Sequence, residues 1–334
     1  MKHTISLSLA TIILLISASG AFAQSDDMNV ATASFKSGNY AAAISVLKKI
    51  TSKNSSDDKA WLLLGTAYYE SAKYKEAIGA FERAVSLNPT NEVAHVNLAT
   101  AYLARNDKRG QTAAKQTLEI NPKNAQARFV LAAFEYRDQF YSGAYDDARK
   151  AVSLDPHLAD AYRVIYGSLV ASFAGLSGKV VAPAARAELM TKAVDAFQKY
   201  YDLASVDEKT KLAEQLSDLK SFGEYYNRPE AKLPLDAEKT EEPEPGATPL
   251  KILSKPKASF TNRARDRNVN GSVLLLVGFK ANGMIGGVMV LKSLESDLDQ
   301  NCIVAARAIK FVPAAKNGTP VSVVKMVEYS FTLY

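Results

Sequence analysis

The chain has 334 residues, 47% of them hydrophobic and 23% charged, so its length suggests two or three domains with ordinary packed cores. One Cys excludes an intramolecular disulfide and a Cys-rich zinc site, and with only three His the composition predicts no metal and no cofactor. A net charge of +6 is too small to indicate a broad nucleic-acid surface.

The N-terminus has the pattern of an export signal. Lys2 and His3 precede an apolar run over residues 5–19, and Ala21-Phe22-Ala23 supplies the small residues of a signal-peptidase site. Residues 1–23 are therefore predicted to be a cleaved signal peptide, so that the mature chain begins at Gln24. The alternative is an uncleaved membrane anchor, although the run is shorter than the roughly 20 residues of a membrane span.

A motif with a period of 34 residues follows. Its clearest copy has apolar and small residues at helical spacing on two successive segments: Trp61, Leu64, Gly65 and Tyr68, then Ala77, Phe81, Ala84 and Pro89. These stripes predict two antiparallel helices. Gly65 and Ala77 are small enough for the helices to cross closely, and Pro89 ends the unit. The pattern resembles the tetratricopeptide repeat (TPR).

Weaker copies extend the array in both directions. They cover residues 24–57, 92–124 (one residue short), 125–158 and a fifth copy from Ala159. The fifth contains about 15 extra residues within 172–185, where glycines and Pro183 favour an inserted loop over an extended helix. Ser205 and Glu208 form a capping box for a closing helix over 206–226. Residues 24–227 are thus predicted to be a TPR solenoid with a capping helix.

The resemblance to TPR proteins implies a non-catalytic binding scaffold whose inner groove is lined by the first helices. In this register the groove would carry Asn29, Lys59, Leu62, Thr66, Tyr69, Val93, Asn97, Phe129, Tyr136 and Arg163. Such a mixture suits proteins or extended peptides as partners. Asn97 matches a position that clamps a C-terminal carboxylate in some family members, but Leu62, Thr66 and Val130 depart from that clamp. The alternative is a solvated inner face without a ligand.

Residues 228–249 are predicted to be a linker. From Pro229 to Pro249 there are five Pro, and six acidic residues oppose two Lys. Pro-rich charged segments stay extended, so this one could separate two domains by up to about 60 Å. Beyond it, residues 250–334 carry 12 basic and 5 acidic side chains. This excess fits either contact with an acidic envelope surface or a solvated basic face.

Residues 250–334 are predicted to form a small α+β domain of order ββαβ. Strands are expected over 272–280, which alternates poorly, and over 285–291, joined by the hairpin signal Asn282-Gly283. A helix over 298–309 would bury Leu298 and Cys302, and a last strand is expected over 321–333. The glycines at 278, 283, 286 and 287 lack the Lys-Ser/Thr of a phosphate loop.

This domain resembles the C-terminal domain of TonB-family proteins, chiefly over the run from Leu298 to Val321, which includes Ala305-Ala306-Arg307 and Lys310-Phe311-Val312-Pro313-Ala314. The resemblance implies the periplasm of a Gram-negative-type bacterium, and an outer-membrane receptor or peptidoglycan as partner. It also implies strand addition at the last strand. The candidate partner-binding residues are Phe260, Arg263, Val323, Lys325 and Val327. The same strand could pair with a second copy in a homodimer, or Lys325 and Glu328 could guard it against pairing.

The predicted fold class is therefore α + β multidomain, an α-helical TPR solenoid followed by a small TonB C-terminal-like domain. The predicted function is an exported periplasmic adapter that binds protein partners through both parts and is not an enzyme. The alternative is a divergent TonB-type energy transducer for outer-membrane transport. A third hypothesis, an enzyme, has little support because no catalytic constellation stands out and His and Cys are sparse.

Overall fold

The computed structural model describes residues 26–176, 182–228, 231 and 245–332. The predicted signal peptide lies outside these residues, as does most of the predicted linker. Contacts between residues divide the chain into two compact units, with the boundary between Val164 and Ile165. This boundary falls inside helix α9 (Ala159–Ala174) and does not coincide with the predicted linker at 228–249.

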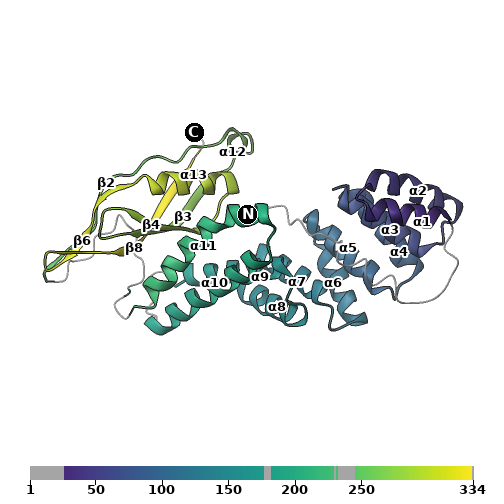
Figure 1. Ribbon diagram of the computed structural model, residues 1–334, viewed down its shortest axis with the longest axis horizontal. Helices are drawn as coiled ribbons and strands as arrows, with labels where there is room; N and C mark the ends of the chain where they lie inside the picture. Colours follow the sequence, from purple (N-terminus) through teal and green to yellow (C-terminus); the bar gives the residue numbers. More distant parts are fainter. Residues whose placement is uncertain (1–25, 177–181, 229–230, 232–244, 333–334) are drawn as a thin grey trace. The chain divides into compact units, whose positions relative to one another are not determined.

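The first unit consists of antiparallel helix pairs (Figure 1). They are α1 (Asp26–Lys36) with α2 (Tyr40–Lys53), α3 (Asp58–Glu70) with α4 (Tyr74–Leu87), α5 (Glu92–Ala104) with α6 (Arg109–Ile120), and α7 (Ala125–Arg137) with α8 (Tyr141–Leu154). Each pair is one predicted repeat, so the helical repeat region is confirmed. The start of α9 completes the unit.

The helix pairs cross closely where the sequence places a small residue. A Cβ atom on Gly65 in α3 would lie only 2.5 Å from Cδ1 of Phe81 in α4, and the Phe81 side chain is fully buried. The ring of Phe81 therefore fills the space that a larger residue at position 65 would need, as predicted from the repeat motif.

The turn inside each repeat contains one residue with a left-handed backbone. These residues are Gly38, Ala72, Asn106 and Gln139, with φ of 77°, 56°, 60° and 63°. They follow one another at 34, 34 and 33 residues, so the shortened repeat is visible in the backbone itself. Only the first of the four is glycine, although L side chains disfavour this conformation.

The second unit begins with the rest of α9, α10 (Pro183–Leu203) and α11 (Val206–Tyr226). Of the predicted insertion, residues 177–181 lie outside the described part. The described remainder includes the last three residues of α9 and the first three of α10, a 21-residue helix that also holds the predicted second-helix residues Ala193 and Phe197. Ser205 and Glu208 form the predicted capping box at the start of α11.

The C-terminal part of this unit has the predicted ββαβ order. Strands β3 (Gly271–Phe279) and β4 (Ile285–Lys292) form a hairpin, α13 (Ser296–Arg307) follows, and β8 (Val323–Phe331) pairs antiparallel with β3, so the sheet order is β4-β3-β8. Short elements that the sequence did not predict surround it: β1 (Ala247–Thr248), β2 (Lys251–Ser254), α12 (Asn262–Asp266), β5 (Lys310–Val312), β6 (Ala314–Lys316) and β7 (Thr319–Val321).

Buried side chains lie on both faces of the β4-β3-β8 sheet. One face packs on α13, where Leu298 and Cys302 lie in a core with Val277, Phe279 and other strand residues. The opposite face presents a second set of buried side chains, from Leu276, Met289, Leu291 and Val324. Helix α11 contacts β4 and lies on this second side (Figure 1). A strand covered on both faces has no polar side, which explains the poor alternation of residues 272–280.

Candidate partner-binding surfaces

The candidate groove residues lie on the first helices of five successive repeats. Asn29 is on α1, Lys59, Leu62, Thr66 and Tyr69 are on α3, Val93 and Asn97 are on α5, Phe129 and Tyr136 are on α7, and Arg163 is on α9. Asn29 and Lys59 are exposed, and Val93, Tyr136 and Arg163 are half-buried. The other five are buried. Helices α3, α5 and α7 contact one another in order, so the central candidates lie on neighbouring helices.

Two buried polar groups in this set have no hydrogen-bond partner among the described residues. They are Oδ1 of Asn97, whose residue is 2% exposed, and the hydroxyl of Tyr69, whose residue is 5% exposed. By contrast, the hydroxyl of Thr66 is satisfied, because it donates to the carbonyl of Leu62 at 2.9 Å. Buried polar atoms are almost always paired, so these two are exceptions, and neither is exposed to a ligand in this structure.

Charged groups connect Tyr69 on α3 with Arg163 on α9. Burial raises the pKa of Tyr69, and the hydroxyl of Tyr74 and the carboxylates of Glu70 and Asp160 raise it further. Asp160 in turn forms an ion pair with Arg163, with 3.1 Å between Oδ1 and Nη2. A tyrosine whose pKa is raised stays protonated at neutral pH, so it can donate a hydrogen bond but cannot serve as a base.

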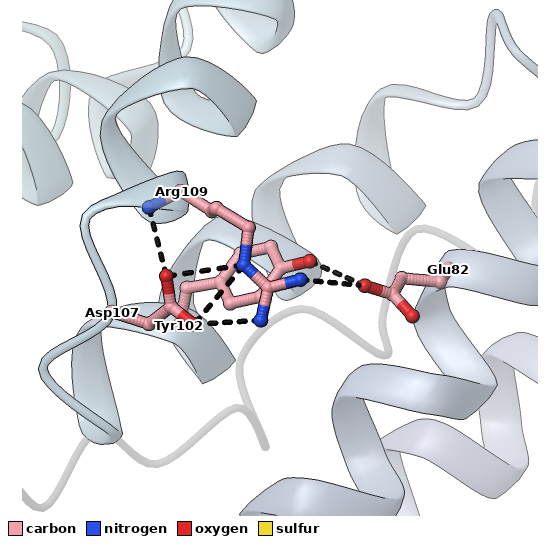
Figure 2. A network of polar contacts seen from close by, with 4 residues as sticks. All are labelled: Glu82, Tyr102, Asp107 and Arg109. Carbon is pink, nitrogen blue, oxygen red and sulfur yellow. Dashed lines mark hydrogen bonds and ion pairs between the residues drawn. The ribbon is translucent and has the colours of Figure 1, made fainter.

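A polar network ties two adjacent repeats together (Figure 2). The hydroxyl of Tyr102 on α5 donates to Oε1 of Glu82 on α4 at 2.5 Å, and the guanidinium of Arg109 lies 4.5 Å from the centre of the Tyr102 ring. Hydrogen bonds from Arg109 hold the pKa of Asp107 below its usual value. Each of the four residues has a partner within the network. The network therefore connects the two repeats and provides no free acid or base for catalysis.

The candidate residues of the C-terminal domain do not form one cluster. Phe260 stacks edge-on against Phe331, with 5.3 Å between ring centres, at the end of β8. Val323 and Lys325 lie at the opposite end of that strand, where they pair with Phe279 and Val277 of β3. Arg263 is exposed on α12, whereas Val327 is 3% exposed and belongs to the core over α13. A partner could therefore reach the backbone edge of β8 but not the Val327 side chain.

A contact that the sequence analysis missed joins α11 to the sheet. Oδ2 of Asp218 accepts the backbone N–H of Val288 at 3.2 Å and a hydrogen bond from Nη2 of Arg307 at 2.6 Å. Burial raises the pKa of Asp218, while the Val288 N–H and Arg307 act in the opposite direction. Two features of the sequence could have indicated this contact: Gly278 and Gly287, to which the sequence analysis gave no role, and the poor alternation of β3. A Cβ on Gly287 would lie 2.7 Å from Oγ of Ser221, and one on Gly278 would lie 3.8 Å from the Phe222 ring.

No group of three or more His, Cys, Asp or Glu side chains suited to a metal ion occurs within the described ranges. In the same ranges, no helix combines the length and the apolar character that crossing a bilayer requires.

Comparison with known families identifies both parts of the chain. The model of the cytochrome c-type biogenesis protein H TPR domain matches residues 46–157. The model of the Gram-negative bacterial TonB protein C-terminal domain matches residues 256–333. The chain thus contains a TPR domain and a C-terminal TonB-family domain. These domains define a protein-interaction scaffold, and the TonB-family domain implies association with a Gram-negative envelope.

Among solved structures, the chain is similar to several structures of MamA. A crystal structure of MamA protein is 22% identical, covers 54% of this chain and 96% of its own, and has a TM-score of 0.44. A second MamA crystal structure is 20% identical, with coverages of 57% and 99% and a TM-score of 0.45. MamA 41-end from Desulfovibrio magneticus RS-1 is 18% identical, with coverages of 55% and 94% and a TM-score of 0.42. No curated protein matched the chain.

Proposed function

We propose that the protein is an exported periplasmic adapter that binds one protein partner in the TPR groove and a second at the TonB-like domain, without catalysing a reaction. Export rests on the signal-peptide pattern of residues 1–23. The described Tyr and Cys groups with shifted pKa values all shift upward, away from neutrality, which is the opposite of what an activated nucleophile needs.

The observation that carries this proposal is the edge of β8. All nine residues of β8 pair with β3 on one side, and no described residue pairs with its other side. A long edge of unpaired backbone N–H and C=O groups is a template for an added strand. Glu328 and Ser330 are exposed along it, so the C-terminal half of β8 is accessible.

The groove supplies the second surface. Lys59 is exposed and Tyr136 and Arg163 are half-buried, so these are side chains that an extended peptide could contact. The exposed ammonium of Lys59 lies on the same first helix, α3, as Tyr69 and favours a partner segment with acidic character.

Photo-crosslinking in cells tests the proposal at β8. A photoreactive phenylalanine analogue at Glu328 should yield a covalent adduct of discrete mass with a protein partner, because the probe lies beside the added strand. The same analogue at Gln300, which is also exposed but lies on α13, is the matched control and should give little or none. Equal adducts from both positions, or none from Glu328, would contradict binding at this edge.

A divergent energy transducer of the TonB class is the second candidate, favoured by the match of residues 256–333 to the TonB C-terminal domain. Such a protein would keep residues 1–23 as a membrane anchor. The two candidates thus differ at the N-terminus and share the binding edge.

A further inference from the structure

The two edges of the β4-β3-β8 sheet differ. At β8 the outer edge has no partner among the described residues, whereas at β4 the N–H of Val288 donates to the carboxylate of Asp218 on α11. A backbone N–H of an edge strand would otherwise donate to a carbonyl of the next strand. The carboxylate of Asp218 therefore occupies the acceptor position that an added strand would use at β4.

The approach of α11 to β4 depends on residues that have no other evident role. Gly287 leaves room for Oγ of Ser221 and for the carbonyl of Asp218, which would lie 2.7 Å and 3.1 Å from a Cβ atom there. Arg307, at the end of α13, bonds Asp218 at 2.6 Å and Glu214 at 3.0 Å, so it joins α11 to the domain from the opposite side of the sheet. Three elements far apart in sequence thus converge on one carboxylate.

We propose that α11 is an intramolecular guard of the β4 edge. By holding the Val288 N–H, Asp218 closes this edge to a second copy of the chain or to a partner strand, and it leaves β8 as the edge for strand addition. Covering an edge with a helix is one of the ways in which proteins avoid edge-to-edge association. The guard acts on β4, and it holds whether or not the adapter function is correct.

Amide hydrogen exchange of the full chain, together with its association state, tests this guard. In Asp218→Ala, exchange of the Val288 amide should accelerate on the order of tenfold to a hundredfold, because a hydrogen bond to a charged acceptor is lost. Exchange of the Leu275 and Leu276 amides in central strand β3 should stay slow. The variant should also associate with rising concentration in analytical ultracentrifugation. It keeps Arg307 paired, since Glu214 remains, so folding is expected to persist.

Glu214→Gln is the matched control. It also removes one carboxylate from Arg307, but the Glu214 side chain is 69% exposed and forms no hydrogen bond with β4 among the described residues, so Val288 exchange and the association state should match the parent. Unchanged Val288 exchange in Asp218→Ala would overturn the guard. Equal acceleration in β3 would overturn it too, since Asp218 would then support the whole domain. Accelerated exchange without association would show that the β4 edge needs no guard.

Discussion

Cys302 is enclosed in the core between α13 and the sheet. It is fully buried beside Leu298, Ala305 and Ala306, as the spacing on the predicted helix indicated. Burial raises the pKa of its thiol to about 12, and the nearby carboxylate of Asp299 adds to this effect. Because the thiolate is the reactive form, the folded protein should carry an inert cysteine.

The reactivity of this thiol is a direct measure of the integrity of the domain. At pH 8, which lies well below a pKa of about 12, the native chain should release almost no thionitrobenzoate from Ellman's reagent over minutes. In guanidinium chloride the pKa returns toward its ordinary value and one thiol per chain should react. A Cys302→Ser chain should give no signal in either state. Rapid reaction of the native protein would contradict the buried position.

At the scale of elements, the left-handed turn residues of the repeats allow the exchange of glycine and alanine to be tested in both directions. Gly38 and Ala72 occupy equivalent turns, with φ of 77° and 56°. No atom lies within 4 Å of the position that a Cβ on Gly38 would take, so replacement there changes only the backbone preference. An L residue in this conformation costs roughly 1–2 kcal/mol, offset in part by the lower entropy of its unfolded chain.

Ala72→Gly should therefore stabilise the repeat region by about 0.5–1 kcal/mol, and Gly38→Ala should destabilise it by a similar amount. Urea unfolding followed by circular dichroism at 222 nm would give the two shifts. Gly79→Ala is a useful control, because Gly79 lies within α4 with an ordinary φ and no atom near its Cβ position, so alanine there should stabilise through helix propensity alone. Destabilisation by Ala72→Gly would contradict the assigned turn conformation.

Sequence periodicity predicted the elements that are long enough to show a period. The four helix pairs and α13 fall in this class, because an apolar stripe recurs several times within each. Strands β3 and β4 were predicted from the hairpin signal Asn282-Gly283 between them, although residues 272–280 alternate poorly. Strands such as β5 and β7 have three residues each and cannot display a pattern. The packing of α11 against β4 could not be predicted either, since Asp218 and Val288 are 70 residues apart and no local sequence pattern relates them. Buried and exposed residues alternate from Val327 to Phe331 along β8, and this alternation places Val327 in the core. The choice of Val327 as a partner-binding candidate did not take the alternation into account.

At the scale of the whole molecule, the choice between adapter and transducer depends on the N-terminus. The intact mass of the protein purified from its native cells should correspond to a chain that begins at Gln24, either free or cyclised, because Ala21-Phe22-Ala23 is a cleavage signal. An Ala23→Leu chain should retain Met1, since a large residue blocks signal peptidase. A native mass that includes residues 1–23 would instead favour the transducer.

The contact of α11 with β4 also changes the role expected for the segment between Asn227 and Gly246. Both residues belong to the same compact unit, so the connection between them is not required to set a distance between two bodies. Loop closure depends only weakly on length, and doubling such a loop costs about 0.6 kcal/mol. This stretch is therefore the natural place to insert an affinity tag or a fluorescent module, or to open the chain for circular permutation.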